Sequence, residues 1–168
     1  QWMIGSTAYV ADHADEDIRS MVNLDCISYQ AAEPDDPAYA RARLYYTVRT
    51  DVVDDLAAAL KLYTGVTCAT GESNRSDHLS FSNAGFSAAW LWASTGGPAH
   101  KAWDSVDTPG NVNYEYATLL TSGVVGYLAS LLFPHEPRAP ELTYWGWRQR
   151  GTADTDRPQA SAGSRGRG

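Results

Sequence analysis

The sequence has few basic residues, two cysteines and no long apolar run, and each shortage argues against a class of function. Thirteen Lys and Arg stand against twenty Asp and Glu, a formal net charge of −7, so the clustered positive charge that binds nucleic acid is lacking. No apolar stretch approaches the roughly 20 residues that cross a bilayer, so we expect no membrane span. Cys26 and Cys68 lack metal-type spacing, and either a disulfide or a reduced pair of small core residues fits them.

The chain also lacks an initiator methionine and a signal peptide at its start. It begins at Gln1 and enters at once on an apolar run, Trp2-Met3-Ile4, of the kind that finishes a buried strand or turn. We therefore expect the domain to be incomplete at its N-terminal side.

The sequence does contain an alternation of two apolar patterns, one typical of buried strands and the other of amphipathic helices. Near-continuous apolar runs predict strands over residues 21–29, 42–48 and 87–93. From Asp51 to Gly65 the apolar residues recur at helical spacing, and shorter or later helices are expected from Ser6, over residues 76–84 and over residues 112–132. This alternation predicts a three-layer α/β/α domain, with helices on both faces of a largely parallel, mixed sheet.

The C-terminal part has a different composition. Residues 1–134 carry the α/β pattern, and residues 135–150 form an extension that contains an aromatic patch, Tyr144-Trp145-Gly146-Trp147. Residues 151–168 have no apolar side chain larger than alanine, so we expect a disordered tail.

Three polar clusters could carry chemistry. Asp25 lies in an apolar run, where a carboxylate needs a metal, a cation or hydrogen-bond donors, although an Asp that caps a neighbouring loop fits as well. The second cluster is Ser76-Asp77-His78, which an ordinary structural Asp–His pair would also explain. The third is His100, four residues before Asp104, and an ordinary loop histidine is the alternative there.

The order of these clusters resembles the zinc peptidase family M28. Asn23-Leu24-Asp25-Cys26-Ile27-Ser28-Tyr29 is similar to a family strand whose Asp binds zinc, and Ser76-Asp77-His78 with Phe81 and Gly85-Phe86 is similar to its Ser-Asp-His segment. His100 to Ser105 resembles the His-Thr-x-x-Asp-Thr loop, whose His binds the other zinc. A second register through Asp107-Thr108 would place Trp103 at the ligand position, and Trp cannot bind zinc.

The resemblance covers about residues 1–132 and implies a function. The opening segment, Gln1 to Tyr9, resembles one that follows two adjacent glutamates in the family, one the general base and the other a zinc ligand. These glutamates, a first His and a bridging Asp would all lie upstream of Gln1. The resemblance thus implies a zinc-exopeptidase-like fold, incomplete at its N-terminal side, that needs the missing N-terminal part as a partner.

The implied complete enzyme is an aminopeptidase that hydrolyses N-terminal residues from peptides with a two-zinc activated water. Asp25 and His100 would be metal ligands, and Asp77 and Asp104 would support ligating histidines. The chain alone is expected to be inactive, and a secreted or cell-envelope location is expected from the family. A non-catalytic binding or scaffold domain with the same fold is the alternative.

Overall fold

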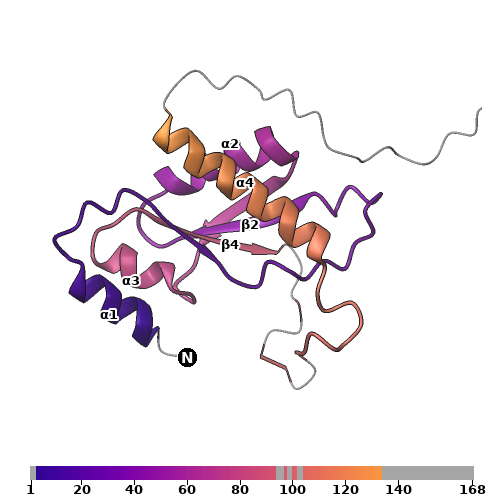
Figure 1. The fold of residues 1–168 in the computed structure, drawn as a ribbon, viewed down its shortest axis with the longest axis horizontal. Coiled ribbons are helices and arrows are strands. Elements are labelled where there is room, and N and C mark those ends of the chain that lie inside the picture. Colours follow the sequence, from indigo (N-terminus) through magenta and orange to yellow (C-terminus); the bar gives the residue numbers. More distant parts are fainter. Residues whose placement is uncertain (1–2, 94–96, 98–99, 102–103, 134–168) are drawn as a thin grey trace, which may run out of the picture.

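The computed structural model describes residues 3–93, 97, 100–101 and 104–133, and Figure 1 shows their path. Helices and strands follow one another in the order α1 (Ile4–Asp12), β1 (Met21–Leu24), β2 (Arg41–Tyr46), α2 (Asp51–Thr64), β3 (Thr67–Glu72), α3 (His78–Asn83), β4 (Ala88–Ala93) and α4 (Tyr114–Leu132).

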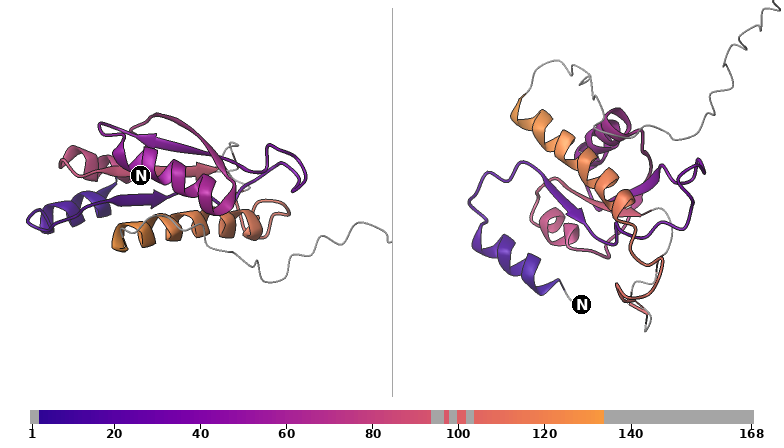
Figure 2. Two further views of the ribbon diagram at one scale, coloured as in Figure 1. Left: turned by 90° about the horizontal axis from the view of Figure 1, so that it is seen from above. Right: turned by 45° about the vertical axis from the view of Figure 1, so that its right-hand side comes forward.

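The four strands form one mixed sheet in the order β1-β4-β2-β3. β1 is parallel to β4 and β2 is parallel to β3, while β2 and β4 are antiparallel and join the two pairs. Helices α2 and α4 pack together on one face, and α1 and α3 pack together on the other (Figures 1 and 2). The predicted three-layer α/β/α architecture with a largely parallel, mixed sheet is confirmed.

The main core lies between the sheet, α2 and α4. Leu44 of β2, Leu91 of β4, Leu60 of α2 and Leu120 of α4 have no exposed surface, because alternate strand residues and one stripe of each helix turn to the same layer. The predicted amphipathic helix is α2, and Gly65 ends it with a φ of 74°, a conformation that glycine adopts without strain.

The smaller core on the other face joins α1 and α3 to β4 through Val10, Phe81 and Ala88. The expected helix near Ser6 exists, but its start was placed too late. The helix begins at Ile4, its N-cap is Met3, and Ser6 lies inside the first turns. Ser6 Oγ instead donates a hydrogen bond to Asp77 Oδ1 at 2.7 Å, which ties α1 to the start of α3.

Residues 134–168, which hold the aromatic extension and the predicted tail, lie outside the described residues, so the division at 134 and 150 stays a prediction. Both cysteines, Cys26 and Cys68, are free. Among the described residues, no helix combines the length and apolarity that crossing a membrane requires.

Candidate functional site

Asp25 lies where β1 ends, and its position is fixed by backbone contacts with β4. Its amide donates to the carbonyl of Leu91 at 3.3 Å, and Trp90 Nε1 donates to the Asp25 carbonyl at 3.2 Å. The predicted strand is cut short because Cys26 turns the chain with a φ of 59°, a left-handed conformation that is rare for a residue with a side chain. The Asp25 carboxylate is thereby held at the carboxyl end of β1.

Two side chains donate hydrogen bonds to the Asp25 carboxylate. Ser76 Oγ donates to Oδ2 at 2.6 Å, and the Cys26 thiol donates to Oδ1 at 3.2 Å. Asn23 Nδ2 in turn donates to Ser76 Oγ at 2.6 Å, so Asn23, Ser76 and Asp25 form one relay. Our sequence reasoning missed the role of Ser76. The available signal was its place at the head of the Ser-Asp-His segment.

Removing the Ser76 hydroxyl should destabilise the chain. Ser76 is 5% exposed, so Ser76→Ala leaves the amide of Asn23 without its acceptor and one carboxylate oxygen of Asp25 without its donor. We expect a loss of about 1–3 kcal/mol in the free energy of unfolding, measured by urea denaturation. Ser122→Ala is the control, because the exposed Ser122 hydroxyl only donates to a carbonyl of its own helix. Equal effects of the two substitutions would contradict a supporting role for Ser76.

Neither cysteine is poised as a nucleophile. Burial, together with the hydrogen bond and negative charge of Asp25, raises the pKa of Cys26 to about 11, and burial raises the pKa of Cys68 to about 11. Both thiols therefore stay protonated at neutral pH, and the thiolate is the reactive form. The Cys26 thiol acts as a hydrogen-bond donor to Asp25.

Asp25 opens into a cavity of about 560 Å³ at the carboxyl ends of β1 and β4. One wall consists of three aromatic side chains, Tyr45, Trp90 and Trp92, whose ring centroids lie 4.9–6.0 Å apart. The polar wall is formed by the segment after β3. The lining residues are Asp25, Cys26, Tyr45, Glu72, Ser73, Asn74, Arg75, Trp90, Trp92 and His100.

His100 borders the same cavity as Asp25, which brings two of the predicted site residues together. It is exposed and has a φ of 62°. Its backbone amide donates to Asp104 Oδ2 at 3.1 Å, so Asp104 holds the backbone of the histidine and leaves its ring free of that contact. The proposed contact between Asp104 and a ligand ring stays a prediction.

His78 is placed quite differently from His100. It has no exposed surface, its Nε2 donates to the Ser73 carbonyl at 2.8 Å, and its ring lies 5.7 Å from that of Trp90. Burial lowers the pKa of His78, although the hydrogen bond to the Ser73 carbonyl, the nearby backbone of Ser76 and the charge of Asp77 oppose this. Its Nδ1 is buried and has no hydrogen-bond partner among the described residues. This environment suits a neutral core histidine.

The predicted role of Asp77, the support of a ligating histidine, stays a prediction. Its carboxylate accepts the hydrogen bond from Ser6 on the α1 side. Within the described part of the chain, no group of three His, Cys, Asp or Glu could hold a metal ion. Asp25 and His100 therefore supply two donors at one cavity, and a complete metal site requires further ligands.

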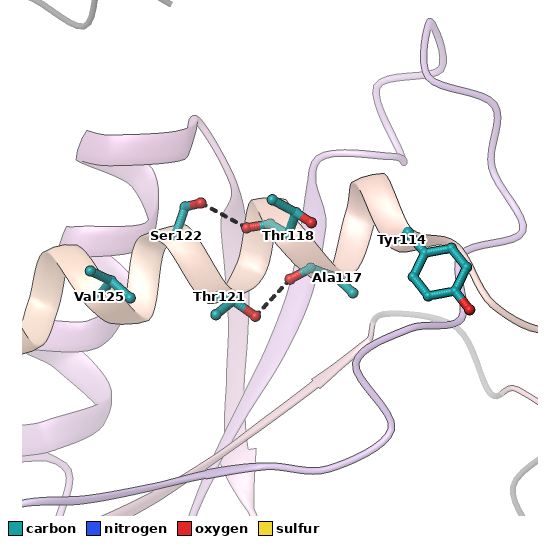
Figure 3. Close-up of a pocket in the computed structure, with 6 residues that line it drawn as sticks. All are labelled: Tyr114, Ala117, Thr118, Thr121, Ser122 and Val125. Atoms are coloured by element: carbon teal, nitrogen blue, oxygen red, sulfur yellow. Dashed lines mark hydrogen bonds between the residues drawn. The ribbon is translucent and has the colours of Figure 1, made fainter. Parts of the chain in front are cut away.

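A second hollow lies along the outer side of α4 (Figure 3) and has a volume of about 400 Å³. The hydroxyls of Thr121 and Ser122 turn to their own helix, because Thr121 donates to the Ala117 carbonyl and Ser122 to the Thr118 carbonyl. The lining residues, Tyr114, Ala117, Thr118, Thr121, Ser122 and Val125, include no carboxylate or imidazole. The cavity at Asp25 is thus the better candidate for chemistry.

Asp25 and His100 line one cavity outside the carboxyl ends of β1 and β4, the place where open α/β sheets bind their ligands. The sequence model of peptidase family M28 matches residues 1–123, and the chain belongs to this family. Its membership supports a peptidase-type function.

Solved structures of bacterial aminopeptidases are similar to the chain over 77% of its length. The LapA aminopeptidase of Legionella pneumophila shares 21% identity with a TM-score of 0.64, and 35% of its length is covered. An aminopeptidase from Aneurinibacillus sp. strain AM-1 shares 25% identity with a TM-score of 0.59 and 30% coverage. BSAP, a zinc aminopeptidase from Bacillus subtilis, shares 16% identity with a TM-score of 0.58 and 32% coverage. No curated protein sequence matches the chain.

Proposed function

We propose that the chain forms part of the active site of a zinc-dependent aminopeptidase, in which Asp25 and His100 bind two different zinc ions. The observation that carries this proposal is that both residues line one cavity although 75 positions separate them along the chain. Family membership and the aminopeptidases of similar fold support the reaction class. The chain spans about a third of the length of those aminopeptidases, so the activity of the whole protein belongs to the proposal.

The residues present fit zinc, but they are too few. A carboxylate and an imidazole are donors that zinc prefers, and each catalytic zinc usually has three protein ligands. Ser76 and Cys26 donate hydrogen bonds to the Asp25 carboxylate, as supporting residues do around metal ligands. Zinc in such a site lowers the pKa of a bound water and polarises the carbonyl to be attacked.

We further propose that the other ligands and the general base come from polypeptide outside the described residues. The free edge of β1 supports this, since among the described strands β1 pairs with β4 alone and a free edge offers unpaired backbone groups to another strand. In that assembly, Asp25 would orient one metal, His100 the other, and the aromatic wall would limit the access of water to the peptide.

The test of this proposal is an assay of the purified 168-residue chain on an aminoacyl-nitroanilide, with zinc added. We expect no chelator-sensitive turnover and weak zinc binding, because two ligands from two sites satisfy neither metal and no general base accepts the proton of the water. Chelator-sensitive turnover by this chain alone would contradict the proposal. It would then direct the search for ligands to His13, His78 and His135.

A non-catalytic binding or scaffold domain is the second candidate. The observation that favours it is the lack of any three-residue metal-binding group among the described residues. The genomic sequence that precedes Gln1 separates the two functions. An in-frame Glu-Glu pair with an upstream His and Asp supports the enzyme, and a start codon at that point supports the binding domain.

A further inference from the structure

Two arginines stand on the face of β2 that is turned away from the main core. Ala42 and Leu44 are 2% and 0% exposed, because they point into the layer of α2 and α4. Successive strand residues point to opposite faces, so Arg41 and Arg43 project from the other side of the sheet. Both are exposed, and neither has an ion-pair partner in the described part of the chain.

Among the described residues, the strand neighbours of these arginines on β3 are small. On β3, Thr67 pairs with Arg41 and Ala69 pairs with Arg43, and both β3 residues are small and exposed. On β4, Trp92 is opposite Arg43. Side chains of directly opposed residues share one face of a sheet, so Arg43 projects from the same face as Trp92 and Ala69.

This face continues into the cavity at Asp25. Trp92 lines that cavity together with Asp25, and Leu24 pairs with Leu91, so Asp25, Trp92 and Arg43 follow one another across three adjacent strands. Strands lie about 4.8 Å apart, which places the backbone of Arg43 about 10 Å from that of Asp25. An extended peptide covers this distance with about three residues.

We propose that this face of β2 binds the carboxylate-bearing part of the peptide substrate, with Arg43 and Arg41 as its partners and Trp92 beneath the intervening residues. The proposal rests on the proposed peptidase function and adds a substrate class. The substrates would be peptides with an acidic side chain or a free C-terminal carboxylate about three residues from the peptide bond that is cleaved beside Asp25. Charge complementarity carries it. Neither guanidinium group has an ion-pair partner in the described part of the chain, and guanidinium groups bind carboxylates through paired hydrogen bonds.

Binding to the 168-residue chain without added metal tests the proposal independently of turnover. The probes are two pentapeptides, Ala-Gly-Gly-Asp-Asp as the free acid and Ala-Gly-Gly-Asn-Asn as the amide, and the readout is calorimetric titration at low salt. We expect the acidic peptide to bind more tightly by about 2- to 5-fold per arginine, as exposed ion pairs allow. The preference should fade at high ionic strength.

Arg43→Gln and the double variant with Arg41→Gln should reduce or remove this preference, and the fold should persist because both side chains are exposed. Arg19→Gln is the matched control. It removes the same charge from an exposed arginine that pairs with Asp17. Equal affinity of the wild-type chain for both peptides, or no binding of either, would overturn the proposal. So would an equal loss of preference in Arg19→Gln and Arg43→Gln, since that would reflect net charge alone. None of these results bears on zinc binding by Asp25 and His100.

Discussion

Gly123→Ala should lower the free energy of unfolding by about 1–3 kcal/mol, although alanine is the better helix former. Gly123 lies in α4 where that helix meets α2. A Cβ atom added there would come within 2.4 Å of Leu60 Cδ2 and 3.2 Å of the Leu60 Cα. Leu60 has no exposed surface and its backbone belongs to α2, so the contact is relieved only if the two helices separate.

Gly5→Ala in α1 is the control for helix propensity. Nothing lies within 4 Å of a Cβ atom at Gly5, so we expect this change to raise stability by up to about 1 kcal/mol. The measurement is urea denaturation followed by far-ultraviolet circular dichroism on both variants. The two substitutions should therefore have opposite signs. If Gly123→Ala stabilised the chain as Gly5→Ala does, the close packing of α2 on α4 would be wrong.

Segments with a strong hydrophobic period were predictable from the sequence. The helix after Asp51 was identified because its apolar residues repeat at helical spacing and Gly65 can adopt the left-handed conformation that ends it. The buried strand over residues 87–93 was identified because apolar residues occupy both of its faces. In the structure this strand is β4, and both of its faces are buried.

Where one side of an element faces solvent, the signal was weak. The strand β3, with the sequence Thr-Cys-Ala-Thr-Gly-Glu, was missed because it is a largely exposed edge strand in which only Cys68 and Gly71 are half-buried. The early end of β1 also escaped prediction. It depends on the positive φ of Cys26, and no glycine marks that position.

The candidate site was predictable only in part, because several of its contacts join residues far apart in the sequence. Asp25 and His100 carried motifs, and the structure brings both to one cavity. The hydrogen bond from Ser76 to Asp25 joins residues 51 positions apart, and the aromatic wall joins Tyr45 to Trp90 across two antiparallel strands. Strand order decides these contacts, and local spacing in the sequence does not reveal it.

His100→Ala should empty one of two zinc sites and lower kcat/KM by about 1,000-fold or more, in a polypeptide that supplies the remaining ligands. A metal that activates water contributes several kcal/mol to the transition state, and each 1.36 kcal/mol is a factor of ten. His100 is exposed at the cavity of Asp25, and Asp104 holds its backbone, so its imidazole is available to a metal.

His78→Gln is the matched control, since the glutamine amide can still donate to the Ser73 carbonyl and so protect the fold. His78 has no exposed surface and packs beside Trp90, so a zinc ion would have to displace core side chains to reach it. In the polypeptide that supplies the remaining ligands, we expect two zinc ions per molecule in His78→Gln and one in His100→Ala, counted by elemental analysis of the purified proteins. Two zinc ions in His100→Ala together with one in His78→Gln would reverse the assignment, and Nδ1 of His78, buried without a partner among the described residues, would then be the ligand.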